Sequence, residues 1–346
     1  MIDNKIEELF EENFSIVIDS KQNPLRLDKF LLGRLFNTTR SKIQNAIQEG
    51  VILINNKQVK SNYKVRPGDV VTGTIPKKRE PGSIVTAEDL PLDIVYEDED
   101  VLIINKKAGM VVHPGISNYS GTLVNALKFY FENKNLPIME GNDVDRPGIV
   151  HRIDKFTTGL LLIAKNEKAM TFLAKQFFDH SIEREYLALV WGNFDVDKGT
   201  VDKNIGRSLK NRKVMATFEE EDLGKRAVTH YEVLEDLYYV SLVKCKLETG
   251  RTHQIRVHLK YVGHPVFNDD IYGGDKIVKG TVFTKYKQFV QNCFGLLTGF
   301  TLHAHTLGFI HPTTKEKMIF KADLPNEFSE VLDKWRKYVS VRKDSI

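Results

Sequence analysis

Short apolar runs separated by polar stretches predict most of the strands in this chain. Four runs rich in apolar residues are strand candidates, and they lie at residues 101–105, 159–165, 186–192 and 238–248. Residues 253–259, HQIRVHL, alternate instead between apolar and polar side chains, which predicts a fifth strand. On such a strand Arg256 lies on the polar face, where it can pair with a carboxylate.

Residues 13–75 are predicted to form a small compact domain. Residues 25–35 have the apolar spacing of an amphipathic helix. Ser41 is the expected N-cap of a second helix, because its hydroxyl can accept from a free backbone N–H of the first turn. Two short strands are expected to follow, joined by the turn-prone pair Asn55 and Asn56.

Residues 76–93 combine Pro, Gly and mixed charge without a sustained period, which is typical of a linker. Residues 94–340 are then predicted to form one large α+β domain. Within it, Asn166 can cap a helix that runs through His180, and a last helix is expected over residues 326–338. Helices and strands do not alternate regularly, so a doubly wound fold is not expected.

The composition excludes several classes of protein. No apolar run approaches the roughly 20 residues that span a bilayer, so no membrane segment is expected. The acidic first residues lack the layout of a signal peptide. The two cysteines, Cys245 and Cys293, have no redox or metal-binding spacing. These features predict a cytoplasmic protein.

The distribution of charge says more than the net charge of +4. Residues 21–80 hold thirteen Lys and Arg against four Asp and Glu, while the flanking residues 1–20 and 81–100 are acidic. A basic segment of this kind suits the binding of phosphates. It is also typical of an ordinary solvated surface, so charge alone leaves both interpretations open.

The densest group of polar residues is HRIDKFTTGL, at residues 151–160. Asp154 stands just before a Thr-Thr-Gly turn that leads into an apolar strand. A carboxylate in that position can project into a cleft and act in catalysis, or it can simply cap the turn. The local pattern does not decide between these two roles.

Three histidines follow in the next polar segment, His253, His258 and His264. Their spacing matches no standard zinc pattern, and an HExxH sequence is absent, so no metal is expected. Elsewhere, Lys106 and Lys107 end a strand and could meet either phosphate or water. Tyr186 begins an apolar strand, where a core tyrosine is the usual interpretation.

Four segments taken in chain order, INKKAGMVVHPG, HRIDKFTTGL, REYLALV and ETGRTHQIRVHL, resemble the RluA/RluD-type RNA pseudouridine synthases. The resemblance covers about residues 90–322. Ile153 replaces the usual Leu and Lys107 the usual Pro, and neither change touches the catalytic positions. Residues 25–72 are similar to an S4 RNA-binding domain. The resemblance implies a mixed, largely antiparallel sheet in the catalytic domain, after a small S4-like α/β domain.

The same resemblance implies catalytic roles for three residues. Asp154 is the catalytic carboxylate, acting as a nucleophile or a base toward the nucleoside. Arg256 pairs with it, which favours its ionised form and fixes its rotamer. Tyr186 stacks on the base and assists removal of the proton from C5.

Four further residues are expected to bind the substrate. Leu302 packs beneath the base, and Arg152 fills the space that the base leaves when it is extruded. Lys106 and Arg251 are the candidates for contacts to phosphate.

These residues predict an enzyme that isomerises specific uridines without a cofactor or metal. The pairing of domains favours large-subunit ribosomal RNA, in a precursor of that subunit, and we expect a monomer. Three alternatives stay open: the same chemistry on transfer RNA, a non-catalytic RNA-binding assembly factor, and a hydrolase of glycosidic bonds. A glycosidase usually needs two carboxylates about 5–10 Å apart, whereas the polar segments offer Asp154 with an arginine.

Overall fold

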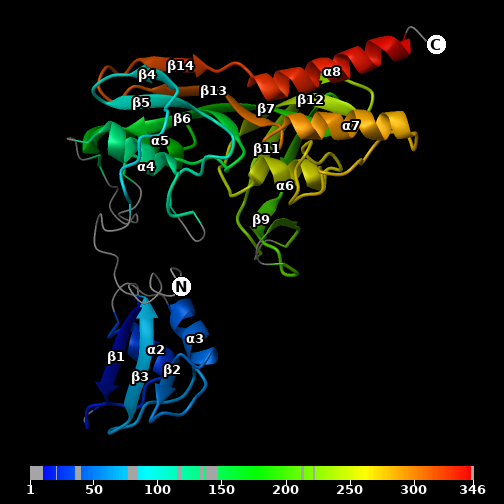
Figure 1. The fold of residues 1–346 in the computed structure, drawn as a ribbon. Coiled ribbons are helices and arrows are strands. Elements are labelled where there is room, and N and C mark those ends of the chain that lie inside the picture. Colours follow the sequence, from blue (N-terminus) through cyan, green and yellow to red (C-terminus); the bar gives the residue numbers. More distant parts are fainter. Residues whose placement is uncertain are drawn as a thin grey trace. The chain divides into compact units, whose positions relative to one another are not determined.

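The computed structural model describes residues 11–20, 22–35, 40–76, 85–114, 118–132, 136–137, 147–211, 214–220 and 223–343. The chain divides into two compact units, Met1–Ile84 and Val85–Ile346 (Figure 1). Parts of the sequence predictions lie outside the described residues, among them 1–10 of the acidic leader, 36–39 of the small domain, 77–84 of the linker and Gly115 of the INKKAGMVVHPG segment.

The N-terminal unit packs two helices against a small antiparallel sheet with the order β1-β3-β2. Its elements are β1 (Glu11–Val17), α2 (Leu27–Leu32), α3 (Arg40–Gln48), β2 (Ile52–Ile54) and β3 (Val70–Pro76). The core consists of aliphatic side chains, with Leu31 and Ile47 from the helices against Ile52 and Val71 from the sheet, all fully buried. Burial of this apolar area is what holds so small a unit together.

Two details of this unit differ from the sequence prediction. The second helix begins at Arg40, so Ser41 lies inside it rather than at its N-cap. Arg40 donates two hydrogen bonds to the buried carboxylate of Asp28 on α2, and this ion pair draws the first residue of α3 into place. Asn55 and Asn56 form the expected turn with positive φ, but the strand after it is a single bridge at Lys57.

The C-terminal unit is built on a nine-stranded sheet with the order β4-β5-β6-β13-β7-β12-β11-β8, with β14 beside β13. All described pairings are antiparallel except that of β13 with β6, so the predicted mixed, largely antiparallel α+β fold is confirmed. The nine strands of this sheet are β4 (Ile94–Glu97), β5 (Val101–Lys106), β6 (Thr158–Ala164), β7 (Glu183–Trp191), β8 (Lys198–Asp202), β11 (Val228–Asp236), β12 (Val240–Leu247), β13 (Leu302–Ile310) and β14 (Lys317–Lys321). A separate two-stranded sheet pairs β9 (Asn204–Arg207) with β10 (Met215–Phe218).

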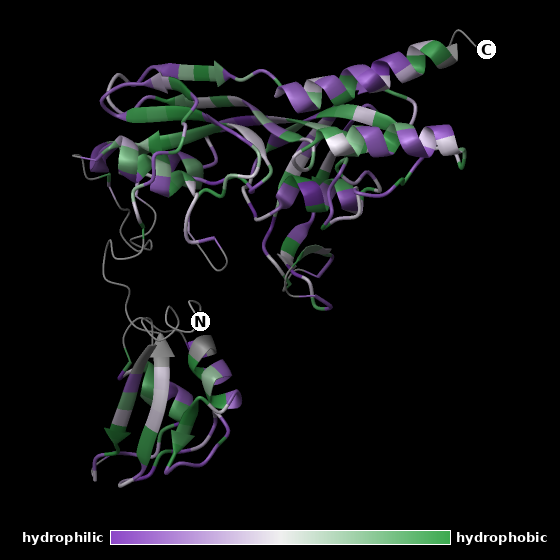
Figure 2. Cartoon of the chain, in the orientation of Figure 1, coloured by the Kyte–Doolittle hydropathy of each residue, from purple (hydrophilic) through white to green (hydrophobic). Residues whose placement is uncertain are grey.

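The described part of this unit has five helices, which cover the two faces of the sheet. They are α4 (Leu123–Tyr130), α5 (Glu167–Phe178), α6 (Gln254–Tyr261), α7 (Thr284–Leu296) and α8 (Asn326–Lys343). Residues of α4 and α6 share one core with one face of the sheet, whereas α5, α7 and α8 pack in two cores on the other. Figure 2 shows hydrophobic residues along the central strands and mixed polarity on the helices, as expected for helices with one buried face. None of the helices among the described residues has the length and apolar character needed to cross a bilayer.

Four of the five predicted strands are present, as β5, β6, β7 and β12. The fifth prediction is wrong, because residues 254–261 form helix α6. Every side chain from Gln254 to Leu259 is buried, including the polar ones. The period-two pattern therefore did not separate a solvent face from a core face, because the polar side chains hydrogen-bond inside the protein.

Part of the expected linker belongs to the C-terminal unit. Val85 is buried, and Lys128 of α4 donates to its carbonyl. Asn125 of α4 donates in the same way to the carbonyl of Thr86. These contacts attach the stretch that precedes β4 to the face of the sheet that α4 covers.

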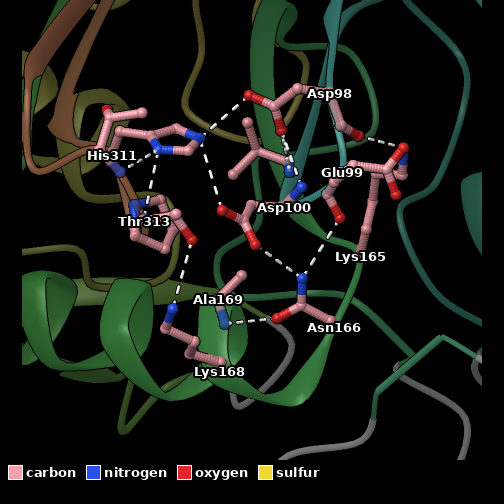
Figure 3. Close-up of polar contacts among 12 residues, drawn as sticks. Asp98, Glu99, Asp100, Lys165, Asn166, Lys168, Ala169, His311 and Thr313 are labelled. Atoms are coloured by element: carbon pink, nitrogen blue, oxygen red, sulfur yellow. Dashed lines mark hydrogen bonds and ion pairs between the residues drawn. The ribbon is translucent and has the colours of Figure 1, made fainter.

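Helix α5 is anchored at its N-terminus by a polar network (Figure 3). Asn166 caps the helix by accepting from the backbone N–H of Ala169, as the sequence predicts, and donates to Asp100. His311 lies 3.0 Å from Asp98 and 3.8 Å from Asp100, which joins the turn before β5 to the loop after β13. This network fixes the helix whose far end reaches the candidate site.

Candidate active site

A cavity of about 520 Å³ opens where the Asp154 loop, the end of α5, strand β7 and the start of α6 meet. Six of the seven residues that the sequence singled out line it: Arg152, Asp154, Tyr186, Arg251, Arg256 and Leu302. They come from segments up to 150 positions apart, since Arg152 and Leu302 both border the cavity. The fold thus brings the separate polar segments into one place.

The side chain of Asp154 points toward Arg256 rather than into its own turn. Its backbone carbonyl accepts from the N–H of Thr157 and closes the turn, while Oδ2 lies 2.9 Å from Nη1 of Arg256. The side chain is 18% exposed, so one edge of the carboxylate stays open to the cavity. The turn-capping interpretation of Asp154 does not describe this geometry.

Gly159 allows this loop to stand where it does. Its φ is +104°, and a Cβ there would lie 2.3 Å from the carbonyl oxygen of Ala304. A side chain would therefore push β6 away from β13 and shift the loop that carries Asp154.

Arg256 is held from both sides. Its Nε and Nη2 lie 2.7 and 2.9 Å from the two oxygens of Asp269, a bidentate arrangement that fixes the plane of the guanidinium. The guanidinium also lies 4.1 Å from the ring centre of Phe300. Burial alone would lower the pKa of Arg256, but hydrogen bonds and charge from Asp269 and Asp154 raise it above its ordinary value. The arginine is therefore a fixed positive charge beside Asp154.

Tyr186 lies on the central strand β7, with Ala304 of β13 and Cys245 of β12 as its cross-strand partners. Only 7% of the residue is exposed. Burial raises the pKa of Tyr186, Arg184 opposes that shift, and Asp154 adds to it. The phenol is neutral in the resting site, and Tyr186 lines the cavity.

His253 is the nearest histidine to Asp154, with Nε2 4.0 Å from Oδ1. Its φ of +57° is left-handed, and its Nδ1 lies 2.7 Å from the hydroxyl of Tyr272. Burial lowers the pKa of His253, and the charge of Asp154 only partly offsets this. The other two histidines of that segment bond elsewhere, His258 to Thr229 and His264 to the carbonyl of Trp191.

Two of the expected substrate-binding arginines stand at the edge of the cavity. Arg152 is exposed, with Nη1 3.3 Å from Nε2 of His113. Arg251 is partly exposed and donates from Nε to the carbonyl of Arg226. Both residues line the cavity.

Lys106 is at odds with its expected contact to phosphate. It is 2% exposed, and its ammonium donates to three carbonyls, those of Lys107, Met110 and Lys155. Burial lowers the pKa of Lys106 to about 7, and the charge of Asp154 opposes this. Because Lys155 follows Asp154 directly, Lys106 ties the loop that carries Asp154 to the turn after β5 instead of reaching solvent.

Positively charged side chains predominate in the lining of the cavity. Among the described residues that line it, Asp154 is the single carboxylate, against four arginines. That count disfavours a hydrolase of glycosidic bonds, which needs a second carboxylate across the scissile bond. Within the described ranges, no three His, Cys, Asp or Glu side chains gather closely enough to hold a metal ion.

The sequence prediction missed two residues of the site, Asp269 and Arg184. Asp269 follows Arg256 by thirteen positions, a spacing that matches no recognised motif. Arg184 precedes Tyr186 by two positions on β7, so the alternation of side chains along a strand could have placed it on the same face.

The chain is similar to known proteins over nearly its whole length. A sequence model of the RNA pseudouridylate synthases matches residues 100–261, and that of the S4 domain matches residues 25–71. A Chlorobaculum parvum protein described as an uncharacterized RNA pseudouridine synthase is 46% identical over 320 residues, covering 92% of this chain and 96% of its own. The ribosomal large subunit pseudouridine synthase D of Zymomonas mobilis is 41% identical over 304 residues, covering 87% and 91%.

A solved structure described as human RNA pseudouridylate synthase domain containing 4 superposes with a TM-score of 0.54. It covers 70% of this chain and 92% of its own at 23% identity, a likeness that supports the fold alone. The two relatives match nearly the whole chain at well above 30% identity. The chain therefore belongs to the RNA pseudouridine synthases, a family of isomerases, and it carries an S4 domain ahead of the catalytic domain.

Proposed function

We propose that this enzyme converts specific uridines of large-subunit ribosomal RNA to pseudouridine, with Asp154 as its catalytic carboxylate. The observation that carries the proposal is the position of Asp154. It is the one carboxylate among the described residues of the cavity wall, it is partly exposed, and a buried arginine holds it. A carboxylate so oriented can reach a nucleoside while its rotamer stays fixed.

The reaction needs no group beyond the side chains present. The bond from N1 to C1′ breaks, the uracil turns, and a bond from C5 to C1′ forms. C5 loses its proton and N1 gains one, so atoms and electrons balance without an oxidant or a cofactor. Asp154 assists the break as a nucleophile or a base, and Arg256 stabilises its charge.

The target base must leave its helical stack to reach Asp154, because the carboxylate is recessed in the cavity. Extrusion costs a few kcal/mol, which contacts to the flipped nucleotide must offset. Tyr186 and Leu302 offer flat and apolar surfaces for the uracil. Arg152, exposed at the rim, is placed to occupy the space that the base leaves, and Arg251 to contact a phosphate.

Two features support a ribosomal substrate. The Zymomonas mobilis relative bears the name of a large ribosomal subunit enzyme and spans nearly the same length as this chain. The S4 domain adds a second RNA-binding unit, and its matched residues 25–71 hold nine basic residues. All the catalytic side chains come from one chain, so a monomer is sufficient for the reaction.

The test is to map pseudouridine across total RNA from a strain that lacks the gene, then to restore wild-type or Asp154→Asn protein. We expect one or a few large-subunit sites to disappear and to return only with the wild type. Loss of a transfer-RNA site instead would show that the substrate is transfer RNA. Return of the site with Asp154→Asn protein would overturn the catalytic role of Asp154. Release of free uracil from RNA in vitro would show a hydrolase instead.

A further inference from the structure

Arg184 is a buried cation without a counter-charge. It is 7% exposed, and Nε is buried without a hydrogen-bond partner. In the described part of the chain no carboxylate forms an ion pair with it. The guanidinium lies instead against the ring of Phe177, whose centre is 5.5 Å from the guanidinium carbon. Buried charges are normally paired, so this side chain calls for an explanation.

The side chains beside Arg184 do not compensate its charge. Burial lowers the pKa of Arg184, yet a guanidinium stays protonated at any physiological pH. Burial lowers the pKa of His151 to about 3, and the charge of Arg184 adds to that shift. His151 is thereby kept neutral and accepts from the backbone N–H of Leu162. Phe177 and His151 therefore offer Arg184 no compensating negative charge.

Arg184 lines the cavity that holds Asp154. Arg184 and Tyr186 lie two positions apart on β7, so their side chains share one face and start roughly 7 Å apart. On the other side lies Gly250, where a Cβ would come within 3.0 Å of Nη1 of Arg184. The absence of a side chain there leaves the guanidinium room beside the turn that precedes α6.

We propose that Arg184 forms a phosphate-binding subsite for the RNA backbone, which receives the phosphodiester next to the flipped uridine. A phosphodiester is the anionic group of RNA, and the guanidinium fork matches two of its oxygens. The short distance to Tyr186 limits the choice to the phosphate on the 5′ or the 3′ side of the target. Arg152 and Arg251, at the rim, extend the positive surface along the strand. The inference rests on the proposed function, since it concerns the same RNA.

The subsite is tested by measuring RNA affinity with full-length Asp154→Asn protein, which binds without turnover. The probe is a hairpin that contains the uridine left unmodified in the deletion strain. Adding Arg184→Gln should weaken binding at least tenfold and reduce the slope of log affinity against log salt by about 0.7–0.9, the value for a single neutralised phosphate. Arg336→Gln, which removes a surface arginine paired with Glu235 away from the cavity, is the matched control and should leave both values unchanged.

A neutral methylphosphonate, placed in turn at each phosphate beside the target, identifies the partner. At one position the methylphosphonate should weaken binding to the protein that has Arg184 by the same factor as Arg184→Gln weakens binding to unmodified RNA. The same methylphosphonate should not weaken binding to the Arg184→Gln protein any further. Unchanged RNA affinity of Arg184→Gln overturns the subsite. The subsite is also overturned if the losses of binding free energy from Arg184→Gln and from the methylphosphonate are additive at every position, because the arginine then affects binding only through the fold.

Stability provides a second readout. Removing an unpaired buried charge should leave the melting temperature of Arg184→Gln equal to or above that of the parent. If Arg184→Gln does not fold, Arg184→Lys replaces it in the same set of affinity measurements with methylphosphonate RNA. Lys keeps the charge but not the fork, so the methylphosphonate effect should shrink without vanishing, and an unchanged effect overturns the subsite. Failure of the hairpin to be modified by wild-type enzyme would instead count against the proposed function.

Discussion

Arg256 bonds to Asp154 and Asp269 at the same time, with Nη1 2.9 Å from the first carboxylate and Nε 2.7 Å from the second. Asp269 is fully buried and also accepts from the backbone N–H groups of Ile271 and Tyr272. The partly exposed carboxylate is thus held through an arginine that a buried carboxylate has already oriented. Rigid support of this kind is what a catalytic side chain requires.

Asp269 should therefore be needed for both stability and turnover. Asp269→Asn leaves the buried charge of Arg256 with Asp154 alone, and removal of one partner from a buried ion pair costs about 3–5 kcal/mol. We expect the free energy of unfolding to fall by that order and kcat to fall with it, as measured by urea denaturation and a turnover assay. Asp270→Asn, at the exposed neighbouring position, is the control and should resemble wild type. A stable Asp269→Asn enzyme with normal kcat would contradict the arrangement.

Arg256→Lys tests geometry separately from charge. Lysine keeps the positive charge, but its ammonium cannot span two carboxylates as the planar guanidinium does. Misplacement of a reacting group by about 1 Å can cost a factor of about 100, so we expect kcat to fall by that order. RNA affinity should change little, because Asp154 and Asp269 already compensate the charge of Arg256. A drop in affinity at unchanged kcat would mean that Arg256 binds RNA rather than orienting Asp154.

Lys106 should make stability depend on pH in the alkaline range. Its pKa is about 7 in the folded protein against an ordinary value of 10.5. Between these values the unfolded chain binds more protons than the native one, so the free energy of unfolding gained from this residue rises with pH. The free energy of unfolding of wild type should therefore rise relative to that of Lys106→Met as pH increases from about 7 toward 10, as measured by urea denaturation at several pH values. A difference independent of pH would show that Lys106 keeps its proton in the fold.

The S4 domain should supply much of the salt-dependent affinity. Removing residues 1–80 deletes thirteen basic residues of the segment from 21 to 80. Each phosphate that the protein then no longer neutralises flattens the salt dependence by about 0.7–0.9. We expect weaker binding and a shallower slope in a titration of RNA at increasing salt, and the melting temperature of the remaining unit checks that its fold survives. An equal slope for the two proteins would place the phosphate contacts on the catalytic domain.

Some features of the molecule depend on local sequence. The helix that Asn166 caps and the four buried strands were predictable, because capping and apolar runs act over a few residues. The resemblance of HRIDKFTTGL and ETGRTHQIRVHL to a known family pointed to Asp154 and Arg256 before any geometry was available. The segment over residues 254–261 was misjudged because a helix buried all round shows no polar face.

The sequence by itself thus determined the family resemblance, the two-domain order and the residues around Asp154. The tertiary structure decided which partners those residues have. It placed Asp269 behind Arg256, turned Lys106 inward onto three carbonyls, and left Arg184 buried without a carboxylate among the residues described. The reason is physical: burial and pairing depend on side chains contributed by distant strands and loops, and their distances are set only when the sheet and helices pack together.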